Sequence, residues 1–144
     1  MVRTILITGA SNGLGAALAQ YYAAPDVHLA LIGRDSGRLE QISATCKNLG
    51  AQVTTASINV TDQVALKHWL DEFDQQYPID LAIANAGVTN MLSKQGSGED
   101  LAAITQVLDT NLYGVIYTLH PLIERMRNRK KGQLAMISSL AAWR

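Results

Sequence analysis

The stretch that decides the fold is Ile5-Leu6-Ile7-Thr8-Gly9-Ala10-Ser11-Asn12-Gly13-Leu14-Gly15, an apolar run followed by three glycines and a helix-forming segment. Gly9 lets the backbone turn sharply after a strand. Gly13 and Gly15 remove side chains where a pyrophosphate would approach the free N–H groups of the next helix. The stretch therefore predicts a phosphate cradle at a helix N-terminus, with Ser11, Asn12 and Leu14 between the glycines.

The spacing of this motif is Thr8-Gly9-x-x-x-Gly13-x-Gly15, whereas the common dinucleotide fingerprint is Gly-x-Gly-x-x-Gly. The two motifs share the mechanism of phosphate binding but differ in the spacing of their glycines. A P-loop is excluded because no Lys-Ser or Lys-Thr pair follows the glycines. Taken alone, the motif leaves open a glycine-rich turn between strand and helix that binds nothing.

The composition indicates neither a strongly charged nor a membrane-spanning protein. The 144 residues predict one domain, residues 1–144, in which 12 basic and 12 acidic side chains cancel. A basic cluster over residues 125–131 falls where a helix should end, which favours a solvated helix end over a nucleic-acid surface. No apolar run approaches membrane-spanning length.

Cys46 is the only cysteine in the sequence, and the three histidines are scattered. An intrachain disulfide and a cysteine-based metal site are therefore excluded, and no metal is expected. Since a reducing compartment is the natural setting for such a chain, we expect a soluble, cytoplasmic protein with no membrane or nucleic-acid partner.

Apolar runs and helical patterns alternate along the chain. Strands are predicted over residues 4–7, 27–32, 52–58, 79–84 and 133–137. Helices are predicted over 14–23, from a cap at Asp35 or Ser36 to Gly50, from a cap at Thr61 to Pro78, and from Glu99 to about residue 128 with a break and a kink at Pro121. The alternation implies an α/β fold, a doubly wound parallel sheet with helices on both faces.

Four short motifs occur in a fixed order along this alternation. They are the glycine motif, Asn85-Ala86-Gly87 after the fourth strand, Asn111 in the long helix, and Ile137-Ser138-Ser139 after the fifth strand. Each is weak alone, since Asn85 could cap a sheet end and the serines could form a polar turn. Together they resemble the short-chain dehydrogenase/reductase family over essentially the whole chain. The resemblance implies a Rossmann-like sheet of five strands in the order 3-2-1-4-5.

In an open parallel sheet, ligands bind outside the carboxyl ends of the strands, at the switch point in strand order. One crevice at this edge would collect the residues that follow each strand. The resemblance implies a dinucleotide there, held by Gly9, Ser11, Asn12, Gly13, Leu14, Gly15, Arg34, Asn59, Asn85, Ala86 and Gly87.

Arg34 bears on the choice of cofactor. An NAD enzyme would place an acid just after the second strand, but this sequence has Gly33 and then Arg34, which can pair with a 2′-phosphate. NADP is therefore favoured and NAD stays an alternative, because Asp35 is adjacent and Asn12 stands where many NADP-dependent relatives carry a basic residue. Asn59 occupies the place where relatives often have an aspartate near the adenine, and its amide oxygen could accept from the adenine amine.

The resemblance also implies the catalytic residues. Ser139 would hydrogen-bond the substrate carbonyl, and Asn111 would steady a water in a proton relay. The family's proton donor is the tyrosine of a Tyr-x-x-x-Lys motif, and none of the five tyrosines here has a lysine four positions later. We therefore expect the chain to correspond to the N-terminal portion of such an enzyme and to be inactive by itself.

The resemblance implies an oxidoreductase that moves a hydride between NADP(H) and a carbonyl or alcohol substrate. A dinucleotide-binding module without chemistry, such as a sensor or an assembly subunit, is the alternative that the missing motif favours. An epimerase or dehydratase of the extended relatives fits less well, because those space the glycines as Gly-x-x-Gly-x-x-Gly.

The long helix suggests self-association. It carries more apolar residues than one sheet face needs: Leu112, Val115, Ile116, Leu119, Leu122 and Ile123. In the family this helix packs against its counterpart in a neighbouring subunit, so a homodimer or homotetramer is expected.

Overall fold

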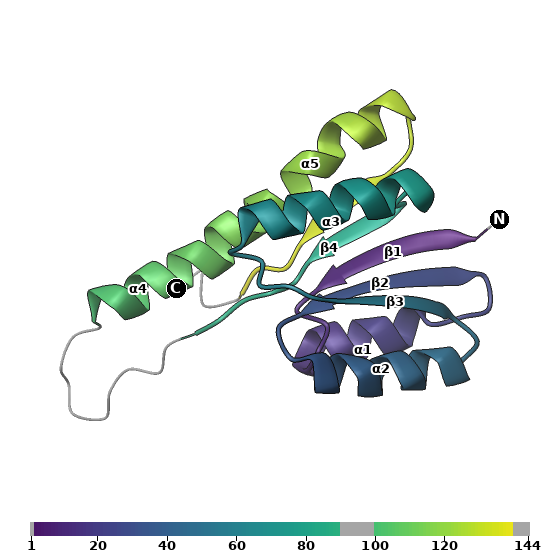
Figure 1. The fold of residues 1–144 in the computed structure, drawn as a ribbon, viewed down its shortest axis with the longest axis horizontal. Coiled ribbons are helices and arrows are strands. Elements are labelled where there is room, and N and C mark those ends of the chain that lie inside the picture. Colours follow the sequence, from purple (N-terminus) through teal and green to yellow (C-terminus); the bar gives the residue numbers. More distant parts are fainter. Residues whose placement is uncertain (1, 90–99, 140–144) are drawn as a thin grey trace.

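The computed structural model describes residues 2–89 and 100–139. Five parallel strands form one sheet with the order β3-β2-β1-β4-β5, which confirms the predicted fold class (Figure 1). Along the chain the elements are β1 (Arg3–Thr8), α1 (Gly13–Tyr22), β2 (Val27–Gly33), α2 (Ser36–Asn48), β3 (Gln52–Ser57), α3 (Gln63–Gln76), β4 (Leu81–Ala84), α4 (Leu101–Leu108), a π-helical turn (Asp109–Tyr113), α5 (Gly114–Asn128) and β5 (Gln133–Met136).

The sheet separates two layers of apolar side chains. Because side chains alternate along a strand, Leu6 of β1 packs toward α3 and α5, whereas its neighbours Ile5 and Ile7 pack toward α1 and α2. Figure 1 shows α1 and α2 on one face of the sheet and α3 and α5 on the other. All seven residues of β2 are buried, as the near-continuous apolar run of a central parallel strand predicts, and they include His28.

The long C-terminal helix is interrupted, and the interruption is not where its proline stands. A π-helical turn over Asp109–Tyr113 separates α4 from α5, while Pro121 lies inside α5. The predicted start at Glu99 lies outside the described residues. Such a turn inserts an extra residue and rotates the side chains that follow it, and π-turns of this kind are frequent at functional sites.

The structure agrees with the sequence on the N-cap of α2 and differs from it on the N-cap of α3. Asp35 caps α2, and its Oδ1 accepts a hydrogen bond of 3.0 Å from the Arg38 N–H, as predicted. The cap of α3 is Asp62 rather than the predicted Thr61, because Asp62 Oδ1 accepts from the Ala65 N–H at 3.0 Å. The Thr61 N–H instead donates to the Asn59 side chain in the preceding turn.

Carboxylates neutralise much of the basic cluster at the end of α5. Arg125 pairs with Asp71 at 3.0 Å, and Lys131 pairs with Asp80 at 2.6 Å. Arg129 lies 2.8 Å from the buried Asp74. These basic side chains are therefore already paired within the protein, which disfavours their use in binding the phosphate backbone of a nucleic acid. Within the described residues, no helix has the length and apolar character that crossing a membrane requires.

Candidate dinucleotide-binding site

The turn between β1 and α1 depends on glycine for more than one reason. Gly9 and Gly13 have φ angles of +66° and +51°, in the left-handed region that favours glycine. A Cβ at Gly9 would approach Ala86 Cα to 2.8 Å, and a Cβ at Gly15 would collide with the Gly9 carbonyl oxygen. A Cβ at Gly13 would meet nothing within 4 Å, so only its backbone angle requires glycine.

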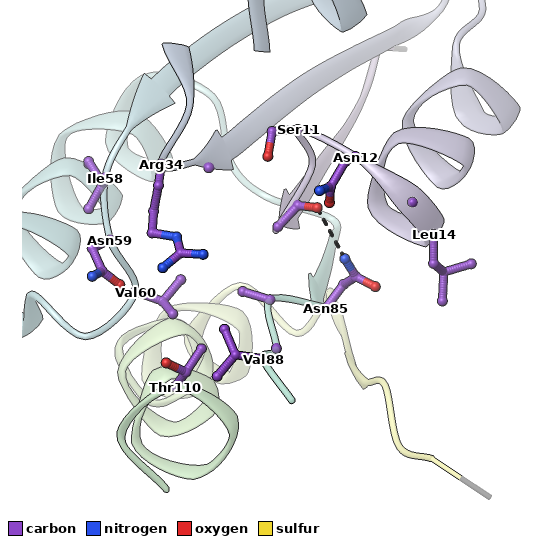
Figure 2. A pocket seen from close by; sticks show the side chains of 15 residues that line it. Ser11, Asn12, Leu14, Arg34, Ile58, Asn59, Val60, Asn85, Val88 and Thr110 are labelled. Atoms are coloured by element: carbon purple, nitrogen blue, oxygen red, sulfur yellow. Dashed lines mark hydrogen bonds between the residues drawn. The ribbon is translucent and has the colours of Figure 1, made fainter. Parts of the chain in front are cut away.

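Thr8 ties this turn to the end of β4. Its buried hydroxyl oxygen accepts hydrogen bonds from the N–H groups of Asn85 and Ala86, each at 3.1 Å. In return, Asn85 Nδ2 donates to the Thr8 carbonyl at 3.0 Å and to the Gly9 carbonyl at 3.4 Å, the second of which is dashed in Figure 2. The sequence did not predict this role of the Thr8 hydroxyl. The one feature that pointed to it was a hydroxyl residue at the last position of a buried strand.

A cavity of about 290 Å³ opens where β1, β2 and β4 end. Ten of the eleven predicted cofactor residues line it: Gly9, Ser11, Asn12, Gly13, Leu14, Arg34, Asn59, Asn85, Ala86 and Gly87. The eleventh, Gly15, is buried beneath the turn, where its missing side chain admits the Gly9 carbonyl. The cavity is also lined by five residues that no sequence pattern predicted: Gly33, Ile58, Val60, Val88 and Thr110.

The N-terminus of α1 faces this cavity. Asn12 is the N-cap, and its side chain makes no capping hydrogen bond. The first bond of the helix joins the Ala16 N–H to the Asn12 carbonyl at 3.1 Å, so the N–H groups of the first turn have no partner within the helix. Such a terminus carries about half a positive charge and suits an anion.

Arg34 is the one charged side chain among the described residues that line the cavity, and Figure 2 shows its guanidinium turned toward the cavity. The Ser57 hydroxyl donates to its carbonyl at 3.1 Å and so fixes the backbone at the end of β2. The neighbouring Asp35 is committed elsewhere, because its carboxylate caps α2 and lies 3.3 Å from Arg38 Nε. Asp35, the acid that would favour ribose hydroxyls, is therefore engaged by α2 rather than by the cavity.

Asn59 lies at the end of β3 with its side chain partly engaged. Its Oδ1 accepts from the Thr61 N–H at 3.2 Å, which closes the turn into α3. One lone pair of this oxygen is thus used locally, and the other stays available to an adenine amine.

The Asn111 amide clamps the chain that follows Asn85-Ala86-Gly87. Its Oδ1 accepts from the Val88 N–H and its Nδ2 donates to the Val88 carbonyl, both at 2.8 Å. The π-helical turn presents Asn111 to this segment, and the next residue back, Thr110, lines the cavity. The described contacts of Asn111 are therefore positional, and its part in a proton relay stays a prediction.

Ser139 lies just beyond β5, at the same edge of the sheet but outside the lining of the cavity. The Ile137 N–H donates to the Ala84 carbonyl at 3.1 Å, so the chain toward Ser139 still runs beside the end of β4. No group of three or more potential metal ligands occurs in the part of the chain that the structure describes.

The sequence and the fold of this chain are similar to those of known proteins. The family model described as short chain dehydrogenase matches residues 3–144. An 11-beta-hydroxysteroid dehydrogenase 1A of Arabidopsis thaliana is 34% identical over 143 residues, which cover 98% of this chain and 40% of the relative. Across the curated relatives the chain spans between 40% and 60% of their length.

Two solved structures are similar over nearly the whole chain. A short-chain dehydrogenase from Sphingobium yanoikuyae in complex with NADPH is 25% identical with a TM-score of 0.87, covering 99% of this chain and 55% of that one. An NAD⁺-bound xylitol dehydrogenase gives a TM-score of 0.89 at 23% identity, with the same two coverages, and shows the fold alone.

Proposed function

The chain belongs to the short chain dehydrogenase family, and on that premise we propose that it binds NADP(H) in the cavity at the carboxyl ends of the strands. The observation that carries the proposal is the pairing of a free helix N-terminus with Arg34, the charged residue of the cavity lining. A dinucleotide offers a phosphate to each: its pyrophosphate suits the turn at Gly13, and a 2′-phosphate suits the Arg34 guanidinium. NAD would leave Arg34 unpaired.

Other residues of the lining fit the remainder of such a cofactor. Asn59, with one amide lone pair in use, lies where an adenine amine could donate to the other. Asn85 and Ala86 are held by Thr8, and Gly87 follows them, so this segment forms a fixed part of the cavity lining. The bound nicotinamide would supply hydride chemistry, while the chain's own residues would orient it and exclude water.

We further propose that the whole protein is an oxidoreductase acting on a carbonyl or alcohol carbon. Ser139, at the same edge of the sheet, would donate a hydrogen bond to the carbonyl oxygen of the substrate. Asn111 would hold the Val88 segment in place beside the reacting atoms. General acid catalysis contributes about 10²- to 10⁴-fold, and no tyrosine of this sequence has a lysine four residues later to supply it. The 144-residue chain alone should therefore be inactive.

A dinucleotide-binding module without chemistry is the second candidate, and the missing Tyr-x-x-x-Lys motif is what favours it. Turnover separates the two. We expect the intact protein to oxidise NADPH with a panel of ketones and aldehydes, and residues 1–144 alone to give no detectable turnover. Binding of NADPH without turnover by the intact protein would favour the module, and turnover by the 144-residue chain would contradict our reading of the missing acid.

We also propose that the protein is a homodimer or homotetramer. An exposed apolar stripe follows α4, the π-helical turn and α5; we call it the helical stripe, and it consists of Leu101, Ile104, Leu108, Leu112, Ile116 and Ile123. These residues recur at intervals of three, four or seven and so share one side of the helices. Large exposed apolar patches of this kind mark association surfaces.

A further inference from the structure

We propose that Asn12-Gly13 is a site of spontaneous deamidation that places a negative charge inside the cofactor cradle. Asn12 is the one asparagine of the 144-residue sequence that precedes a glycine. Asparagine is thermolabile, and its side chain reacts with the backbone nitrogen of the next residue most readily when that residue has no side chain. This sequence pair lies at the N-terminus of α1, within the cavity lining.

The local structure leaves both reacting groups accessible. Asn12 is exposed, and its side chain makes no capping hydrogen bond. Gly13 is the first residue of α1, so its N–H has no partner within the helix. A Cβ at Gly13 would meet nothing within 4 Å, which shows open space beside the Gly13 Cα. Figure 2 shows the Asn12 side chain at the rim of the cavity.

Two other asparagines at the site, Asn85 and Asn111, are protected. Asn85 Nδ2 donates to two carbonyls of the glycine turn, and both amide atoms of Asn111 are bonded to Val88. Ala86 and Leu112 follow these residues, and their side chains hinder the approach of the backbone nitrogen. The contrast lies within one site and singles out Asn12.

The reaction needs only water. The Gly13 backbone nitrogen loses its proton and attacks Asn12 Cγ, so that an N–Cγ bond forms. The Cγ–Nδ2 bond breaks, and ammonia leaves with the proton. Water then opens the resulting succinimide at either of its two carbonyls and leaves aspartate or isoaspartate at position 12. Nothing is oxidised or reduced, and the rate rises with pH because the nucleophile is the deprotonated amide.

The consequence for binding rests on the proposed function. A carboxylate at position 12 would stand at the helix N-terminus that is to receive the pyrophosphate. It would repel that anion and offset the charge of Arg34, the charged residue of the lining. An acid at an N-cap is itself favourable to a helix, so the charge should weaken cofactor binding without unfolding α1. A bound cofactor should in turn cover Gly13 and slow the reaction.

Ageing of the intact protein at mildly alkaline pH tests the inference. Peptide mapping by mass spectrometry follows each asparagine over time, with and without saturating NADPH. Asn48 and Asn128 are internal controls, because both are exposed but precede Leu49 and Arg129. We expect modification at position 12 far ahead of these two, slower modification with NADPH, and about tenfold or more loss of NADPH affinity in the aged protein. The Asn12→Asp variant carries the new charge without the isoaspartate backbone, and it should also lose NADPH affinity without ageing and keep its thermal stability.

Each arm has a contrary result. Position 12 ageing no faster than Asn48 and Asn128 would overturn the modification site. Full modification with unchanged NADPH affinity, or an Asn12→Asp variant that binds NADPH like the parent, would overturn its effect on the cradle. A fresh protein that does not bind NADPH at all would instead remove the proposed function, and the effect on binding with it, while the mass spectra still decide the modification.

Discussion

At the scale of single residues, the glycines of the cradle are required for different physical reasons. Gly13 is needed for its backbone angle of +51°, since a Cβ there has free space. Gly15 has no such angle but must admit the Gly9 carbonyl, which a Cβ would strike. The letter pattern treats the two alike, whereas the structure predicts that they respond differently to substitution.

Gly13→Asn should be tolerated, because asparagine adopts the left-handed region at a cost of about 1 kcal/mol. Gly15→Ala should cost about 1 to 3 kcal/mol or more, because the obstructing atom is backbone and cannot rotate aside. Urea unfolding of both variants measures the difference. Equal destabilisation by the two substitutions would contradict the geometry of the turn.

The sequence predicted which residues gather at the site because the topology of a parallel sheet brings strand ends together. It could not predict the contacts that hold them. The Thr8 hydroxyl meets the Asn85 N–H across 77 residues of sequence, and the Asn111 amide meets Val88 across 23. No local sequence pattern predicts either contact. The available lone pair of Asn59 and the commitment of Asp35 to α2 likewise depend on neighbouring turns.

At the scale of elements, strands were easier to predict than helix ends. The strands of the sheet centre are mostly apolar because both faces are covered. The start of α3 was placed one residue early because Thr and Asp are both good caps, and only the Ala65 N–H shows which one is used. The π-helical turn has no composition signal. The sequence predicted a break in this helix without its position, and the structure places the break at a turn that ends eight residues before Pro121.

The β2–β3–α3 junction should be sensitive to acid. His28 of β2 is buried, its Nε2 lies 2.9 Å from Thr54 Oγ1, and its ring meets the edges of Phe73 and Tyr77. Burial lowers the pKa of His28 from its ordinary value of 6.5. The unfolded chain therefore binds this proton more readily, and the stability contributed by neutral His28 is present above that value and is lost as pH falls below it.

We expect the free energy of unfolding to fall by at most about 1.4 kcal/mol per pH unit below pH 6.5 from this group. The carboxyls of Asp71 and Asp80 do not confound this window, because their cationic partners lower their pKa values below 3.8. Urea unfolding across this range measures the slope. His28→Gln should flatten it, and an unchanged slope in that variant would assign the effect to another group.

At the scale of the whole molecule, the helical stripe is a run of exposed apolar side chains, and β5 exposes further ones. Leu101 is 75% exposed at one end of the stripe, and Met136 of β5 is 69% exposed. Figure 1 shows α4 and the start of α5 extending past the carboxyl ends of the strands. Water contact at this surface is unfavourable, so association should relieve it.

Leu108→Glu combined with Ile116→Glu should convert the intact protein from an oligomer to a monomer, because two charges would enter an apolar contact. Val64→Glu is the control, since Val64 is an apolar residue 80% exposed on α3 and not a member of the stripe. Light scattering at micromolar concentration reads the mass. An unchanged assembly in the double variant, or a parent protein that is already monomeric, would contradict the proposed role of the stripe.

Arg34 is the residue on which the proposed function depends, because it would make this cavity a site for a dinucleotide with a 2′-phosphate. The direct measurement is the ratio of NADH to NADPH dissociation constants for the intact protein and for Arg34→Asp, with Arg127→Asp as a control of equal charge far along α5. We predict that the parent and Arg127→Asp favour NADPH and that Arg34→Asp reverses the order, a change of about tenfold or more. The same ratio in all three proteins would contradict the account.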